Sequence, residues 1–131
     1  TTKEISGLTY INKNSNGWKN GESFLFEFIL YEEKNKLIFK VVISPSDKIY
    51  DVQRLKNILM DIDGFTEPRG KKWLVTYRKN YTYDYSSISD KTTEEITEEM
   101  NKIFDKVIPV INKVEDKFLT NKKELRELKE V

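Results

Sequence analysis

The chain has 131 residues and a mass of 15.6 kDa, which fits one domain. It carries 23 Lys and Arg against 22 Asp and Glu, so it lacks the overall basicity of a general nucleic-acid binder. Histidine and cysteine are absent, which excludes disulfides, thiolate or imidazole metal sites, and catalysis by imidazole or a cysteine nucleophile. No apolar run is long enough to span a bilayer, and Thr1 to Tyr10 lack the pattern of a signal peptide. We therefore expect a cytoplasmic protein with no membrane partner.

The first half of the chain predicts strands. Ile5 to Ile11 alternate weakly and indicate a short edge strand. From Ser23 to Glu33, period-two alternation places one apolar set on a single face: Phe24, Phe26, Phe28 and Leu30. The polar connector Lys34 to Lys36 leads into the β-rich run Leu37 to Ile43, which predicts a hairpin. We expect the phenylalanines to share a core with Leu37, Phe39, Val41 and Ile43.

Two helices and one further strand follow. Ser44, Pro45 and a helical apolar stripe predict a helix from Pro45 to Asp61 that ends at Asp63-Gly64. Lys71 to Lys79 have the composition of a strand that could extend through Tyr85. Thr92 and Glu95 fit a capping box, and the stripe behind it predicts a helix from Thr92 to Leu119. Pro109 lies inside this helix and is expected to kink or split it.

The predicted order is β-β-β-α-β-α. Hairpins followed by helices favour an α+β, two-layer fold, with an antiparallel sheet of about four strands and helices on one face. We expect residues 1–131 to form a single domain, with a charged helical tail at 120–131. The chain begins at Thr1 rather than at methionine, so it could be a fragment of a longer protein.

Two groups of acidic residues could hold a metal ion. Glu32-Glu33-Lys34 has the acid-x-lysine form of a nuclease site, but it falls at the expected hairpin tip, where charged residues are simply solvated. Four aspartates, Asp47, Asp51, Asp61 and Asp63, fit helix ends better than a cation site. A small metal-dependent phosphodiesterase built on Glu27, Glu32 and Asp47 is therefore the third-ranked interpretation.

The segment from Arg69 to Tyr85 mixes basic and aromatic residues. Basic side chains neutralise phosphates and aromatic rings stack on unpaired bases, so this composition suits nucleic acid. The alternative is that the inner residues Trp73, Val75 and Tyr77 belong to the core of a central strand. Strict alternation would place Trp73, Val75, Tyr77, Lys79, Tyr81, Tyr83 and Tyr85 on one side. The candidate nucleic-acid-binding residues are Arg69, Lys71, Lys72, Trp73, Arg78, Lys79, Tyr81 and Tyr83.

Several short motifs resemble a known family. These are Phe24-Leu25-Phe26-Glu27-Phe28, Phe39 to Asp47 with its Ser-Pro-Ser-Asp end, Lys71-Lys72-Trp73-Leu74-Val75-Thr76-Tyr77, and Ile108-Pro109-Val110-Ile111. Together they resemble the C-terminal accessory region of bacterial PD-(D/E)XK nuclease superfamily proteins of restriction or phage-defence type. The likeness spans Phe24 to Phe118 and lacks the nuclease core, so it transfers no catalytic residue. It implies an accessory module beside DNA or the nuclease core, with Lys72, Trp73 and Arg78 as its first contact residues.

The leading hypothesis is a non-catalytic, nucleic-acid-associated accessory domain of a bacterial or phage defence-type nuclease. It needs no cofactor, and DNA is favoured over RNA as its partner. The alternative is a protein-interaction or dimerisation module, for example a phage inhibitor of a host enzyme, that uses the long C-terminal helix. In that case Leu125 and Leu128 would form the interface with a nuclease core, a host protein or a second copy of the chain.

Overall fold

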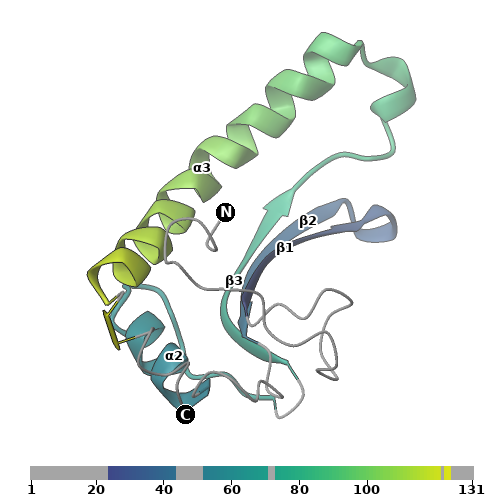
Figure 1. Ribbon diagram of the computed structural model, residues 1–131. Coiled ribbons are helices and arrows are strands. Elements are labelled where there is room, and N and C mark those ends of the chain that lie inside the picture. The colour runs from purple at the N-terminus through teal and green to yellow at the C-terminus, as the bar shows by residue number, and fades with distance from the viewer. Residues whose placement is uncertain (1–23, 44–51, 71–72, 122, 125–131) are drawn as a thin grey trace, which may run out of the picture.

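A computed structural model of the chain describes residues 24–43, 52–70, 73–121 and 123–124 (Figure 1). The sheet is formed by β1 (Phe24–Tyr31), β2 (Lys36–Ile43) and β3 (Leu74–Thr82). The helices are α2 (Val52–Met60) and α3 (Thr93–Thr120), and two short 3-10 helices are η1 (Glu32–Lys34) and η2 (Ile88–Asp90). This arrangement confirms the expected α+β class. The expected strand at 5–11 and the start of the first predicted helix, at 45–51, lie outside the described residues.

The described sheet is antiparallel in the order β1-β2-β3. The predicted hairpin of β1 and β2 is confirmed, and the structure shows in addition that β2 pairs with β3. The hairpin turns through η1 and Asn35, whose φ of 46° lies in the left-handed region that asparagine tolerates better than most residues. Asn35 also forms two hydrogen bonds with the segment that follows β3. Its backbone oxygen accepts from Tyr83 N–H at 2.9 Å, and its Oδ1 accepts from Tyr85 N–H at 3.1 Å.

The long helix α3 begins where its sequence predicts. Glu95 N–H donates to Thr92 Oγ1 at 3.2 Å and Thr92 N–H donates to Glu95 Oε2 at 2.9 Å, which completes the capping box. The helix is not split at Pro109. Pro109 and Asp105, one turn earlier, are both exposed, so water can satisfy the carbonyl that proline leaves without a donor. No helix among the described residues is both long and apolar enough to cross a membrane.

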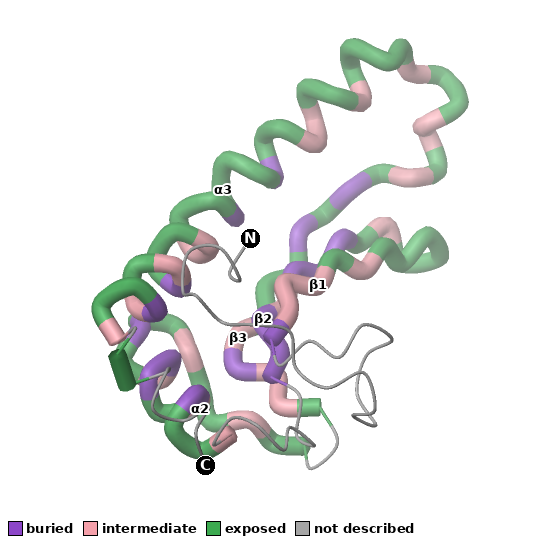
Figure 2. The backbone as a smooth tube through the Cα atoms, viewed as in Figure 1, coloured by how far each residue is buried: buried purple, intermediate pink, exposed green. Residues whose placement is uncertain are grey.

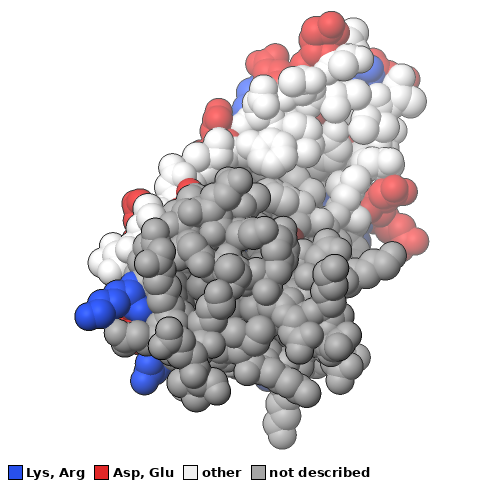
Figure 3. All heavy atoms as spheres, in the orientation of Figure 1, with Lys and Arg blue, Asp and Glu red and all other residues white. Residues whose placement is uncertain are grey.

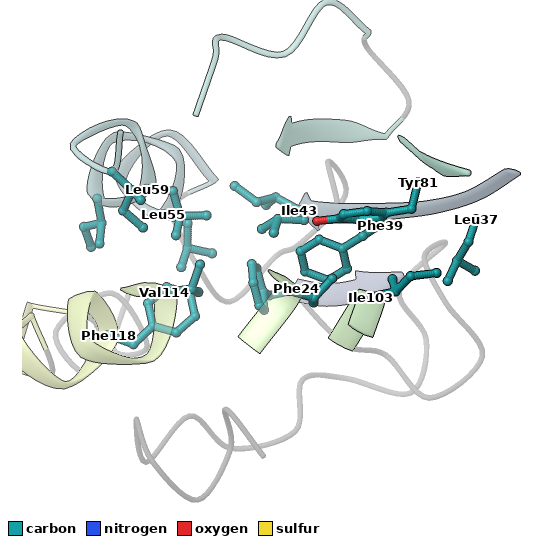
Figure 4. Packing of buried hydrophobic residues seen from close by; sticks show 14 of the residues in the cluster. Phe24, Leu37, Phe39, Ile43, Leu55, Leu59, Tyr81, Ile103, Val114 and Phe118 are labelled. Carbon is teal, nitrogen blue, oxygen red and sulfur yellow. The ribbon is translucent and has the colours of Figure 1, made fainter. Parts of the chain in front are cut away.

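The core lies between one face of the sheet and the two helices, which confirms two layers with the helices on the same side (Figures 1 and 2). Figure 4 shows the side chains of β2, α2 and α3 meeting there. The largest fully buried residues include Phe39 and Ile43 from β2, Leu55 and Leu59 from α2, and Val114 and Phe118 from α3. The Phe24 ring meets Phe118 edge-on, with centroids 5.1 Å apart.

The predicted core residues of β2 are all buried: Leu37, Phe39, Val41 and Ile43. The prediction holds less well for β1. Phe28 and Leu30 are 41% and 43% exposed, because they lie toward the hairpin tip, beyond the most tightly packed part of the core. Phe28 still contacts α3 through the Phe104 ring, at a centroid distance of 5.4 Å.

Candidate nucleic-acid interface

A β-bulge in β3 decides which side chains share a face of the sheet. Val41 pairs with Tyr77 and Val42 pairs with Val75, so Thr76 is the extra residue of β3 and is not opposite any residue of β2 in the register. Thr76 is fully buried, and its Oγ1 donates to the Val41 carbonyl at 3.2 Å. The backbone carbonyl of Thr76 accepts from Thr66 N–H at 2.8 Å, which fastens the loop after α2 to β3.

The bulge changes the alternation that the sequence predicts. Side chains of directly paired residues lie on the same face of an antiparallel sheet. Lys79 pairs with Phe39, which places Lys79 on the helix-covered face, whereas Arg78 pairs with Lys40 on the opposite face, called here the outer face. Without the bulge, residue 75 would share the face of Lys79. With it, Val75 pairs with Val42 and joins Lys40 and Arg78 on the outer face.

A hollow of about 860 Å³, open to solvent, lies between the outer face of the sheet and the loop before β3. Among the described residues, its basic side chains come from three places in the chain: Lys40 from β2, Arg78 from β3 and Arg69 from the loop. Trp73, just before β3, also lines the hollow and is 36% exposed. The structure therefore brings an indole and three cationic side chains around one concave surface.

Only part of the predicted site is assembled there. Arg69, Trp73 and Arg78 line the hollow, while Lys71 and Lys72 lie outside the described residues, as do Leu125 and Leu128. Lys79 is exposed but belongs to the helix-covered face, on the opposite side of the sheet from Arg78, so it does not line the hollow.

Tyr81 and Tyr83, two further residues of the predicted site, do not line the hollow. They are only 9% and 5% exposed and belong to the core cluster, so their rings offer little surface for stacking on a base. Burial raises the pKa of the Tyr81 hydroxyl, and the nearby Tyr77 raises it further, so Tyr81 stays neutral at physiological pH. These two tyrosines are structural residues in the described fold.

Sequence reasoning missed Lys40, which lies in the middle of the otherwise apolar run Leu37 to Ile43. Alternation alone would have turned Lys40 away from its neighbours Phe39 and Val41 and out of the core. What the sequence lacked was the register, because Lys40 becomes part of a basic site only through its pairing with Arg78. On its other side Lys40 pairs with Glu27 of β1.

The charge of the hollow is predominantly positive. Among the described residues, no ion pair engages Lys40, Arg69 or Arg78, and Arg78 Nε donates to Asn80 Oδ1 at 3.4 Å. Glu67 also lines the hollow, but its carboxylate pairs with Lys56 of α2, whose side chain is 12% exposed. Glu67 is the one acid among the described lining residues, and because Lys56 offsets its charge, the hollow can attract an anion.

A second hollow, of about 370 Å³, lies at the start of α3 and has the opposite character. Its lining holds four acids, Asp90, Glu95, Glu98 and Glu99, against Lys91 and Lys102. Lys91 Nζ bonds both carboxylate oxygens of Glu99 at 2.8 Å, and this contact raises the pKa of Lys91. Acidic side chains are prominent at this end of the molecule (Figure 3). A phosphate backbone would be repelled here.

The acidic groups considered for metal binding are not gathered. Glu32 lies in η1, exposed at the hairpin tip, and Asp61 pairs with Lys117 of α3 at 3.5 Å. Within the part of the chain that the structure describes, no three acidic side chains lie close enough to hold a metal ion. Asp47 is outside that part.

Comparisons of the chain with known protein families, with curated proteins and with solved structures found no match. The resemblance to nuclease accessory regions therefore stays a hypothesis. A functional assignment has to rest on the chemistry of the hollow itself.

Proposed function

We propose that this chain is a non-catalytic DNA-binding domain that holds phosphate groups in the hollow on the outer face. The observation that carries the proposal is the convergence of Lys40, Arg69 and Arg78, from two strands and a loop, on one concave surface. Guanidinium groups suit this role because their fork of donors matches the oxygens of a phosphate.

The proposal assigns no catalytic residue and no cofactor to this chain. Its biological setting, an accessory domain of a bacterial or phage defence-type nuclease, comes from the resemblance of short motifs and forms part of the proposal. In that setting another domain or chain would cut the DNA, and the hollow described above would hold a strand near the cutting site.

The balance of charge predicts a weak and salt-sensitive complex. The whole chain has a formal net charge of +1, so attraction must come from the local group of three cations rather than from an overall field. Each phosphate neutralised on a single strand contributes about −0.7 to the slope of log K against log salt. Three contacts should therefore give a slope of about −2.

Fluorescence anisotropy with labelled DNA tests the proposal. We expect binding at about 50 mM salt that weakens steeply by about 200 mM. The triple variant Lys40→Gln, Arg69→Gln, Arg78→Gln should lose this binding. A matched control, Lys102→Gln, Lys106→Gln, Lys113→Gln, removes the same charge from α3, on the other side of the sheet, and should bind like the original chain.

Two results would overturn the proposal. One is equal binding by the two triple variants, which would place the contact elsewhere. The other is no binding of any strand at low salt by the unaltered chain. An RNA strand of the same sequence should bind no more tightly than DNA, and a tighter RNA complex would contradict the choice of DNA.

A second candidate function is self-association through α3. Beside its buried stripe, α3 exposes three apolar side chains, Phe104 (37%), Ile108 (48%) and Leu119 (48%), at spacings that place them on one side of the helix. A second copy of the chain could cover this stripe. Light scattering would then give twice the chain mass, and Ile108→Glu should restore the monomer, whereas Lys113→Glu on the opposite side of α3 should not. A monomeric unaltered chain would exclude this candidate.

A further inference from the structure

We propose that the hollow on the outer face binds an unpaired nucleotide, with the base lying against Trp73 and the adjoining phosphates held by the three cations. This inference rests on the proposed DNA binding and specifies the form of DNA that is bound. It makes the protein selective for single strands over duplex.

The position of Trp73 carries the inference. Trp73 lines the same hollow as Arg69 and Arg78 and has 36% of its surface exposed. Val75, two residues on, pairs with Val42 on the outer face, which is the face that carries Arg78. Proteins that bind single strands without sequence preference combine these two elements, an aromatic platform for the base and cations along the backbone.

The shape of the surface excludes duplex from the same contacts. In a duplex each base is covered on both faces by its neighbours, so an indole can stack on it only if the base leaves the helix. The hollow has a volume of about 860 Å³, within the range of pockets that take single small ligands. It therefore has the size to admit one nucleotide with its phosphates.

The loop that carries Arg69 is held against the hollow on two sides. Thr66 N–H bonds the Thr76 carbonyl, and Glu67 pairs with Lys56 of α2. At Gly70, an added Cβ would come within 3.3 Å of the Trp73 backbone oxygen, so the loop passes close to the start of β3. The backbone that carries Arg69 is thus held near the start of β3 before any ligand arrives.

Three DNA probes of equal length test the inference on the unaltered chain: oligothymidine, an abasic strand with the same phosphates, and a duplex. Because stacking of one base changes affinity by roughly five- to hundredfold, oligothymidine should bind more tightly than the abasic strand by that factor. The duplex should bind no better than the abasic strand. Both comparisons use the unaltered chain, so they do not depend on a variant that folds.

Two substitutions of Trp73 distinguish the contribution of an aromatic ring from that of side-chain size. Trp73→Phe keeps an aromatic ring and should retain most of the preference for oligothymidine, whereas Trp73→Leu should bind the two single strands equally. Circular dichroism of each variant checks that it is folded. Equal binding of oligothymidine and the abasic strand by the unaltered chain, or tighter binding of the duplex, would overturn the inference and leave the proposed DNA binding intact. Binding of none of the probes would overturn both.

Discussion

Thr76 Oγ1 donates a hydrogen bond of 3.2 Å to the Val41 carbonyl, and this contact lies at the step where β3 carries one residue more than β2. Thr76 is fully buried, so the bond forms away from water. On the C-terminal side of Thr76, Arg78 pairs with Lys40, and on the N-terminal side Val75 pairs with Val42. The bulge thus lets both parts of β3 contribute to the same outer face.

Replacement of Thr76 by valine should destabilise the domain. Valine has nearly the same shape but cannot donate to the Val41 carbonyl, so we expect a loss of about 1–2 kcal/mol in the free energy of unfolding. Urea unfolding measures this loss, with Thr82→Val, at an exposed position of the same strand, as the control. If both variants unfold at the same urea concentration as the original chain, the hydrogen bond does not hold the bulge.

Much of the fold could be predicted because its signals are local. The apolar alternation of Phe24 to Leu30, the polar turn before Leu37 and the capping box of Thr92 and Glu95 each depend on residues close in sequence. All three appear in the structure as expected elements. The exposed fraction of Phe28 was not predictable, because it depends on how far the helix layer covers the sheet.

The candidate site was predictable only in part, for a related reason. The mixture of basic and aromatic residues indicated the segment that forms part of the hollow, but a bulge leaves no clear pattern in one sequence. Strict alternation consequently grouped Trp73 with Lys79 rather than with Arg78. Lys40 lies 38 positions before Arg78 in the chain, so only strand register could bring the two together.

Glu67 should weaken anion binding in the hollow, because it is the acid of the lining. Glu67→Gln removes one negative charge and leaves the charge of Lys56 uncompensated, while the hydrogen bond between Thr66 and Thr76 still holds the loop. DNA affinity at low salt should therefore rise by roughly up to fivefold for an exposed charge. Anisotropy at low salt measures the change. Glu33→Gln, exposed at the hairpin tip, makes the same charge change far from the hollow and should have a smaller effect. If Glu67→Gln and Glu33→Gln raise DNA affinity equally, the effect comes from the net charge of the chain and not from the position of Glu67 in the hollow.

Asp84 should make stability depend on pH in the acid range. The Ser86 hydroxyl donates to its carboxylate at 2.6 Å, and this bond, followed by one from Ser87, holds the pKa of Asp84 below its ordinary value. A lowered pKa means that the carboxylate stabilises the fold above the ordinary pKa and that this contribution is lost as pH falls through the folded value. Asp84→Asn should therefore unfold more easily than the original chain at about pH 7 and equally easily at about pH 2. If the difference in stability between Asp84→Asn and the original chain stays constant from about pH 7 to about pH 2, the lowered pKa of Asp84 does not contribute to the stability of the fold.

Arg78 and Lys79 provide the most direct test of the account, because they are adjacent in sequence and their side chains lie on opposite faces of the sheet. Both are exposed cations, so Arg78→Gln and Lys79→Gln change the net charge equally. Anisotropy over a salt series should show that Arg78→Gln weakens DNA binding at least roughly threefold and reduces the salt slope by about 0.7. Lys79→Gln should change neither. Equal losses from the two substitutions, or a larger loss at Lys79, would contradict the claim that the outer face binds DNA.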